Sequence, residues 1–583
     1  MVNRWVVETD LSEDWDFYTR ANVGEVFPDP VSPLTFFYFQ NEGGLGGSEL
    51  GFRDAFFRIG VMEPEELPND ECVVLGVVGG YCYLNASAFR MLGHRAPEMT
   101  ANDIDAAFFG DAPGVPEFVV RPGFDRPDLT EKIAATFQWA LTTPDLPDVR
   151  RHEQAMNALR TSRPDLSRMS DRELVERSLE LIDTHFRGLF GEHVFVSLVA
   201  TMPVGIITKV CQAVGRPDDV LRLLAGVGDI ESAAPAMEMW ALGRRVASSP
   251  ALCAAFDAGA DGLDARLRAS TDPDLTDLVR AFDGFMVNHG SRGPNEWEPR
   301  SPTWETHPEL ALAAIDRMRL SPEASSPSVH HHERAVEREM VGAEIAAMVA
   351  SDPEVHRQFL AALAAAKVFM AGRERTKTNC VKLIEETRVA LLEWGQRCVA
   401  AGTFPHPNSF GMLTRPEVFQ FLDDPTGWCD VLAQREALYD DIAALQEPFL
   451  FVGHPGPMSE YPRRDDVRPA VLGAGGVLQG VPGCPGTARG VARVVVDLHH
   501  PTHLEPGDVL VAPITDPSWT PLFVPAAAVV VNVGAPLSHA VIVSRELGIP
   551  CVVSATDATS RIPDGATVQV DGTTGTVTVV GLP

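Results

Sequence analysis

A serine–histidine pair stands at a position suited to nucleophilic chemistry. Ser538 and His539 follow an apolar, β-branched run over 528–532 and open a short segment that reads as a helix up to Leu547. The first turn of a helix offers free backbone N–H groups and the positive end of the helix dipole, which together bind anions. The same dipole disfavours the imidazolium form, and neutral imidazole is a nucleophile that can accept a phosphoryl group. A histidine that only caps the helix gives the same pattern, so these residues alone leave both interpretations open.

Longer motifs surround this pair. They comprise Gly534, Ser538-His539-Ala540, Arg545-Glu546, Gly548-Ile549-Pro550-Cys551-Val552 and, upstream, Thr515-Asp516-Pro517-Ser518-Trp519-Thr520-Pro521-Leu522-Phe523. With them, residues 473–583 resemble the swivelling phosphohistidine domain of the phosphoenolpyruvate-utilising (PEP-utilising) enzymes, and 515–523 is most similar to the rifampicin phosphotransferase branch. The resemblance implies that His539 is the phosphorylated residue and that Gly534 and Ser538 support the phosphate.

Thr515 and Asp516 are expected to orient His539. In this type of fold their loop follows the strand that ends near Ala512 and lies beside the strand that ends near Asn532. A hydroxyl or carboxylate that accepts one ring N–H fixes the tautomer and leaves the other nitrogen nucleophilic. Alternatively, the Asp516-Pro517 pair only shapes a turn.

Two further motifs resemble the acceptor-binding part of rifampicin phosphotransferase. His289-Gly-Ser-Arg-Gly-Pro-Asn-Glu296 contains Arg292 and Glu296, and a predicted helix carries Arg373-Glu-Arg-Thr-Lys377. The resemblance implies that Arg373 and Lys377 are catalytic and that Arg292 and Glu296 bind the acceptor. A solvated helix edge for Arg373 and Lys377 and a simple ion pair for Arg292 and Glu296 are the alternatives.

Composition limits the classes of partner. The chain has 48 Lys and Arg against 80 Asp and Glu, a net charge of −32, which argues against nucleic acid and against an anionic membrane surface. Its nine cysteines form no C-x-x-C pair, which favours a reducing cytoplasm, and no metal site is expected. His330-His-His-Glu333 is interpreted as a solvated helix start, because consecutive residues point in different directions on a helix.

The chain is too long for one core, since single cores stop growing at roughly 250–300 residues. We expect a multidomain α plus α/β protein, with a mainly helical acceptor-binding domain over 1–450, a linker over 451–470 and a compact α/β swivelling domain over 471–583. Two long helices are predicted over 333–373 and 376–401.

No nucleotide-binding motif is recognised in the sequence. The resembling enzymes carry an ATP-grasp domain, and no such domain and no G-x-x-x-x-G-K-[S/T] loop is found here. We therefore expect ATP and Mg²⁺ to be bound by a separate ATP-grasp protein, which phosphorylates His539 before transfer to a small-molecule acceptor. The alternatives are a non-enzymatic phosphocarrier or regulatory protein, and a synthase subunit that activates a bound substrate by transient phosphorylation.

Overall fold

The computed structural model describes most of the chain, in the ranges 4–38, 40–41, 44–97, 99–110, 114–227, 234–323, 326–464, 466, 469–496, 504–534 and 538–583. Two compact units are present. Unit 1 comprises Met1–Ala200, Trp297–Ser301 and Arg375–Arg468, and unit 2 comprises Thr201–Glu296, Pro302–Glu374 and Pro469–Pro583. The predicted acceptor-binding domain over 1–450 is thus shared between the units, whereas 471–583 lies within unit 2. The boundaries drawn at 450 and 471 remain a prediction.

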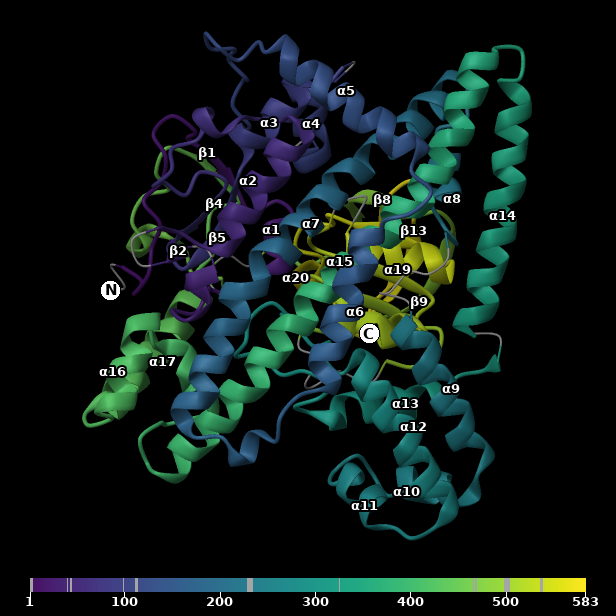
Figure 1. Ribbon diagram of the computed structural model, residues 1–583. Coiled ribbons are helices and arrows are strands. Elements are labelled where there is room, and N and C mark those ends of the chain that lie inside the picture. Colours follow the sequence, from purple (N-terminus) through teal and green to yellow (C-terminus); the bar gives the residue numbers. More distant parts are fainter. Residues whose placement is uncertain are drawn as a thin grey trace. The chain divides into compact units, whose positions relative to one another are not determined.

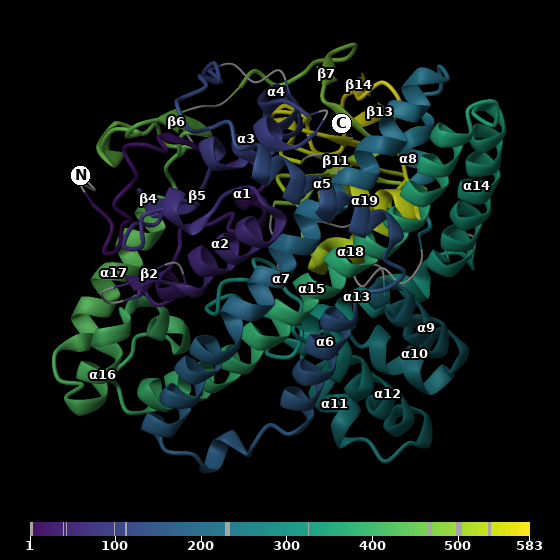
Figure 2. The same cartoon turned by 45° about the horizontal axis from the view of Figure 1, so that its top comes forward.

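Unit 1 contains a small antiparallel sheet of order β4-β5-β1-β6, made from β1 (Phe17–Thr19), β4 (Leu75–Val78), β5 (Tyr81–Asn85) and β6 (Leu450–Val452). The segment predicted as a linker therefore begins in a strand, because Phe451 pairs with Tyr18. Figure 2 shows this sheet beside α2 (Gly47–Ile59) and α3 (Ala86–Arg95). Asn85 caps α3 by accepting a hydrogen bond from the backbone N–H of Ala88 at 3.0 Å.

The remaining elements of unit 1 are mostly helical. They are α1 (Val23–Val26), η1 (Thr35–Tyr38), β2 (Gln40–Asn41), β3 (Gly44–Leu45), η2 (Pro64–Glu66), α4 (Ala101–Phe109), α5 (Pro127–Thr142), α6 (Pro147–Thr161), η3 (Leu166–Arg168), η5 (Pro407–Met412), α16 (Arg415–Asp423), α17 (Trp428–Ala443) and η6 (Met458–Glu460).

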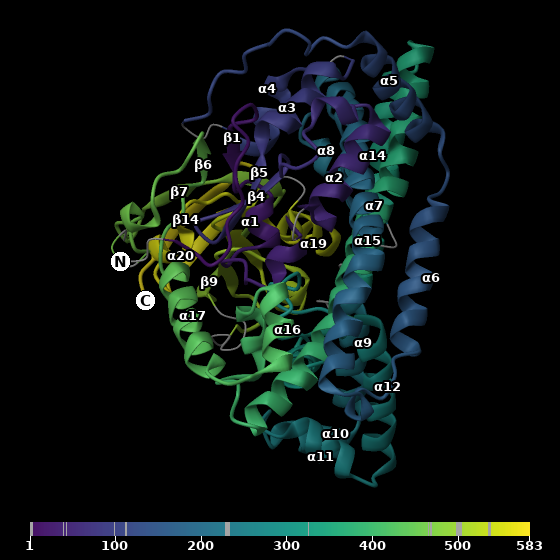
Figure 3. The same ribbon diagram turned by 60° about the vertical axis from the view of Figure 1, so that its left-hand side comes forward.

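Two long helices, α7 (Asp171–Ala213) and α15 (Pro353–Ala400), pass through both units. Within unit 1 they lie side by side (Figure 3), joined by a hydrogen bond from the Ser178 hydroxyl to the Thr387 carbonyl at 3.4 Å. One stretch of α7 is long and apolar enough to cross a membrane, and 56% of it is buried inside the protein, as in the core helix of a soluble protein.

The predicted break between the two long C-terminal helices was wrong. We expected it at 374–375, whereas α14 (Pro327–Met348) ends early and α15 runs unbroken through 374–375. The break occurs before Pro353, which has no N–H and fits the first turn of a helix. Asp352 caps that turn by accepting hydrogen bonds from the backbone N–H groups of Glu354 at 3.1 Å and Val355 at 3.2 Å.

Unit 2 is built around an eight-stranded sheet of order β7-β14-β13-β9-β10-β11-β12-β8, yellow to olive in Figure 1. The strands β9 to β12 run parallel, and the others pair antiparallel. The strands are β7 (Val477–Gln479), β8 (Val481–Cys484), β9 (Thr487–Val494), β10 (Val509–Ala512), β11 (Ala528–Val531), β12 (Cys551–Val553), β13 (Thr567–Asp571) and β14 (Thr576–Gly581). The predicted strands that end near Ala512 and Asn532 and the predicted helix between β11 and β12 are confirmed.

The central strands are buried on both faces, as parallel strands usually are. Along β10, Val509 and Val511 enter one core with α20 (Ala558–Arg561), while Leu510 and Ala512 enter the other. This second core also contains residues of α19 (His539–Leu547) and of the helices α9 (Ala234–Ser248), α10 (Pro250–Asp257), α11 (Leu263–Ala269), α12 (Pro273–His289) and α13 (Pro308–Leu320). The eight-stranded sheet and these helices therefore share one apolar core.

The short elements η7 (Pro517–Trp519) and α18 (Thr520–Phe523) lie between β10 and β11, and α8 (Asp219–Leu223) completes the elements of unit 2. The helix α19 ends at Gly548, which takes the left-handed conformation with φ 67° that glycine adopts without strain.

Candidate functional site

His539 is the first residue of α19, as the sequence predicts, and Ser538 is its N-cap. The Ser538 hydroxyl is buried and has no hydrogen-bond partner in the described structure. Beside it, a Cβ added to Gly534 would lie 2.9 Å from the Cβ of Val553 and 3.1 Å from the Ser538 hydroxyl. Only glycine therefore fits at 534, and a buried hydroxyl and a helix N-terminus lie together beside the histidine.

The imidazole of His539 is held between two threonines. Its Nδ1 lies 3.2 Å from the Thr515 hydroxyl and its Nε2 lies 3.1 Å from the Thr520 hydroxyl. The ring also meets the edge of Phe523, with centroids 5.8 Å apart and an interplanar angle of 80°. Thr515 thus lies within hydrogen-bond distance of His539, as the sequence predicts. The sequence analysis did not predict the contact of Thr520 with the ring.

The neutral form of the ring, which is the nucleophilic form, can bond to both threonines. Neutral imidazole carries one N–H and one lone pair, so one threonine accepts a hydrogen bond from the ring while the other donates one to it. The hydroxyl that donates occupies the position where a phosphoryl group would bond. That threonine must turn its hydroxyl aside when the nitrogen reacts, while the other threonine keeps the tautomer fixed.

Asp516 links this loop to the predicted acceptor motif. Its carboxylate accepts hydrogen bonds from Ser518, including the backbone N–H at 2.8 Å, and one from the backbone N–H of Asn295 at 3.2 Å. Asn295 has a positive φ of 50° and belongs to the 289–296 motif. Unit 2 therefore brings the loop after β10 and the acceptor-like loop together. The bond to Ser518 also supports the turn-shaping alternative for Asp516.

Arg292 and Glu296 form a buried ion pair at 3.2 Å, with side chains 2% and 1% exposed. The pair is the ion pair of the alternative interpretation, and it is almost fully removed from water. Breaking it by removing one partner would leave an uncompensated charge in the interior. Arg292 and Glu296 belong to the same loop as Asn295. The role of the pair in binding the acceptor stays a prediction.

Arg373 and Lys377 lie one helical turn apart in the unbroken part of α15, both partly buried. The guanidinium of Arg373 donates to the carboxylate of Glu374 at 2.6 Å. Arg373 belongs to unit 2, together with His539, and Lys377 belongs to unit 1. Neither side chain is a fully exposed helix edge, and their catalytic role stays a prediction.

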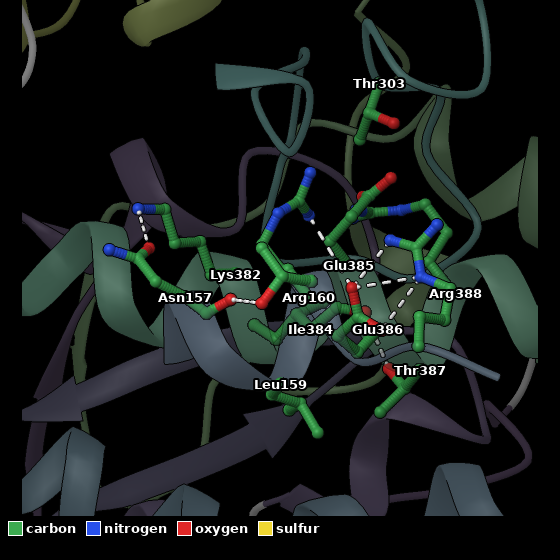
Figure 4. Close-up of polar contacts among 12 residues, drawn as sticks. Asn157, Leu159, Arg160, Thr303, Lys382, Ile384, Glu385, Glu386, Thr387 and Arg388 are labelled. Carbon is green, nitrogen blue, oxygen red and sulfur yellow. Dashed lines mark hydrogen bonds and ion pairs between the residues drawn. The ribbon is translucent and has the colours of Figure 1, made fainter. Parts of the chain in front are cut away.

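Unit 1 holds a buried cluster of charges that the sequence interpretation missed (Figure 4). Glu386 is fully buried and pairs with Arg163 at 2.6 Å, Arg177 at 3.5 Å and Arg160 at 3.8 Å. On the same helix Arg388 pairs with Glu385, and Lys382 donates to the Asn157 side chain at 2.8 Å. The available signal was the polar run Glu385-Glu386-Thr387-Arg388 between the apolar runs 383–384 and 389–392.

His331 differs from its predicted role as part of a solvated helix start. Its Nδ1 lies 2.8 Å from a carboxylate oxygen of Glu546, a residue of α19 that is only 2% exposed. The other oxygen of Glu546 accepts a hydrogen bond from the backbone N–H of Gly226 at 3.0 Å. The hydrogen bond to Glu546 raises the pKa of His331. The carboxylate therefore ties the helix of His539 to α14.

Two family models match parts of this sequence. Residues 193–374 match the rifampicin phosphotransferase fourth domain, and residues 504–575 match the mobile domain of PEP-utilising enzymes. The second match includes Thr515, Thr520 and His539. Residues 504–575 are thus similar to the PEP-utilising enzymes, and residues 193–374 are similar to rifampicin phosphotransferase in particular.

Curated relatives agree with this placement. Rifampicin phosphotransferase of Streptomyces sviceus is 28% identical over 56% of this chain and 37% of its own length. Prodigiosin synthesizing transferase PigC of Serratia marcescens is 26% identical over 99% of this chain and 64% of its own length. An uncharacterized protein of Mycobacterium tuberculosis is 34% identical over 50% of this chain and 30% of its own length. The chain thus spans less than two thirds of each of these relatives.

Proposed function

We propose that this chain is a phosphotransferase component that carries a phosphoryl group on His539 and delivers it to a small-molecule acceptor in the cytoplasm. The observation that carries the proposal is the imidazole of His539 at the start of α19, held by hydroxyl groups at both ring nitrogens. The match of 504–575 to the PEP-utilising mobile domain supports it.

The proposed chemistry consists of two displacements. In the first, the unprotonated nitrogen of His539 attacks the donor phosphorus, an N–P bond forms and the P–O bond to the leaving group breaks. In the second, an acceptor oxygen attacks that phosphorus, the N–P bond breaks, and the electron pair returns to the ring nitrogen. The acceptor's proton passes to a base or to water. The buried Ser538 hydroxyl and the first backbone N–H groups of α19 would stabilise the phosphoryl oxygens.

We propose that the phosphoryl group comes from ATP on a separate ATP-grasp protein, with Mg²⁺ bound in that nucleotide site. On this chain, Arg373 and Lys377 would stabilise the charge that spreads over the transferring group, and Arg292 with Glu296 would hold the acceptor. The fit of Arg292 to this role rests on its place beside Asn295, which contacts the loop of Asp516.

A second use of the phosphoryl group is favoured by one comparison. The relative that aligns over 99% of this chain is named a prodigiosin synthesizing transferase. In the corresponding scheme the phosphoryl group activates a bound substrate for synthesis, and inorganic phosphate leaves. A stable phosphorylated acceptor would identify a kinase-type transfer, whereas phosphate release coupled to a condensation product would identify the synthase.

The donor half of the proposal can be tested with radiolabelled ATP and Mg²⁺, in the presence and absence of a separately purified ATP-grasp protein. We expect acid-labile label on this chain only when both proteins are present. Stoichiometric labelling of this chain alone would contradict the need for a partner. Label that persists when His539→Ala replaces the wild type would contradict the carrier role itself.

A further inference from the structure

A cavity of about 390 Å³ lies within unit 2 and is lined in part by Pro294 of the 289–296 motif. Its walls come from α13, from the turn that leads into α11, and from the segment 518–522. Apolar side chains dominate the lining: Leu263, Trp304, Leu310 and Leu522. A volume in this range and a mainly apolar wall are typical of small-molecule sites.

One cation lines this apolar cavity. Arg317 lies on α13, and burial lowers the pKa of its guanidinium. Among the described residues its side chain has no hydrogen bond or ion pair. The neighbouring Asp316 instead pairs with Arg319 at 2.6 Å, and Arg319 reaches Asp257 at 2.6 Å as well. Arg317 therefore brings five N–H donors to a site where burial without a partner is costly.

Charges at the edge of the cavity restrict what Arg317 could bind. Asp261, Asp264 and Glu309 also line the cavity. Asp261 and Glu309 are exposed, whereas Asp264 is partly buried and pairs with Arg268 at 2.9 Å. Two exposed carboxylates at the edge repel a dianion such as a phosphate monoester more strongly than they repel a single negative charge. The single, partly buried guanidinium also matches one carboxylate, which it can bind with two parallel hydrogen bonds.

We propose that this cavity binds a small apolar monocarboxylate, with the carboxylate on Arg317 and the apolar body against Leu263, Trp304, Leu310 and Leu522. The cavity borders the acceptor-like loop at Pro294 and the segment of Thr520 at Pro521, but the proposed carboxylate binding does not depend on phosphoryl transfer. Because Leu522 and Ser518 belong to the segment between β10 and β11 while Arg317 belongs to α13, a bound ligand would also link these two parts of unit 2.

The test measures binding of octanoate and indole-3-acetate to the full chain by calorimetry and ligand-observed NMR. Octanamide and indole-3-acetamide serve as neutral probes of the same shape. We expect at least one carboxylate to bind and its amide to bind about tenfold more weakly or not at all, because a charge-assisted bidentate pair is lost. Failure of both carboxylates to bind at millimolar concentration, or equal binding of the amides, would overturn the proposal.

Two variants locate the binding site. Arg317→Met removes the cation and Ala313→Phe fills the cavity, and each should weaken carboxylate binding about tenfold or more. Arg280→Met, which removes an exposed arginine of α12 outside the cavity, should bind as the wild type does. Unchanged binding in both Arg317→Met and Ala313→Phe would place the ligand elsewhere and refute the site. Since the two variants alter different contacts, a folding defect in one leaves the other decisive.

Discussion

At the scale of single residues, the proposed reactivity of His539 can be tested at the two threonines that contact its ring. Thr515→Val and Thr520→Val each remove one hydrogen bond to the ring. Loss of the threonine that accepts the ring N–H should slow phosphorylation of His539 by about fivefold to tenfold, since one neutral hydrogen bond contributes about 1 kcal/mol, whereas loss of the threonine that must turn aside should not slow it. Phosphohistidine formation followed over time measures this rate. Thr574→Val, in an exposed turn of the same domain, is the matched control, and equal rates in all four proteins would contradict the account.

In unit 1, the buried carboxylate of Glu386 is the shared ion-pair partner of three arginines. Replacing it with alanine leaves Arg160, Arg163 and Arg177 without their shared carboxylate in a buried site. Loss of one partner from a buried ion pair costs about 3–5 kcal/mol, so the free energy of unfolding should fall by about that amount. Chemical denaturation measures it. Glu354→Ala, at the exposed start of α15, should change the free energy of unfolding little. A similarly small effect of Glu386→Ala would refute the role of Glu386 in stabilising unit 1.

At the scale of elements, the contact between α14 and α19 should depend on pH through His331. Its folded-state pKa is raised above the ordinary value of about 6.5, chiefly by the hydrogen bond to Glu546. The charged pair therefore stabilises the contact fully below about pH 6.5, and the contribution is lost as pH rises through the raised pKa. Arg338, the other charge that acts on His331, works against protonation.

Hydrogen exchange of the segment 541–549, corrected for intrinsic rates, measures this dependence. Protection should be greater at pH 6 than at pH 8.5, and His331→Gln should remove the difference. His330→Gln, the neighbouring change at a partly exposed histidine, should preserve it. A pH dependence that survives His331→Gln would contradict the assignment.

The elements of the C-terminal region were predictable because their signals are local. Each β-branched run is bounded by Gly, Pro or Asp, and the strand–loop–helix order itself delivers Thr515 to His539. Thr520 was missed because its contact depends on the short elements η7 and α18, which carry no periodic pattern. The pairing of Glu386 with Arg163 joins residues 223 positions apart, and that of His331 with Glu546 joins residues 215 apart. Such contacts depend on the tertiary packing of helices, which spacing along one chain does not encode.

At the scale of the whole molecule, Arg373 and Lys377 are two partly buried cations in a chain of net charge −32. Arg373→Ala and Lys377→Ala should leave phosphorylation of His539 intact and slow transfer to the acceptor by about 10²–10³-fold, because one preorganised donor is lost from the transition state. Loss of label from the phosphorylated protein after addition of acceptor measures the step. Arg357→Ala, an exposed arginine on the same helix, is the control, and unchanged transfer in both variants would return the pair to the role of a helix edge.

The most direct test of the central claim is to map the phosphorylated residue. The purified chain is treated with phosphoramidate, a chemical phosphoryl donor that needs no protein partner, and digested under alkaline conditions that preserve phosphohistidine. Peptide mass spectrometry then locates the phosphoryl group. The account predicts that the peptide containing His539 is modified first and to the highest extent, and that His539→Ala removes this fast phase. Fast modification at another residue, or a fast phase that persists in His539→Ala, would contradict it.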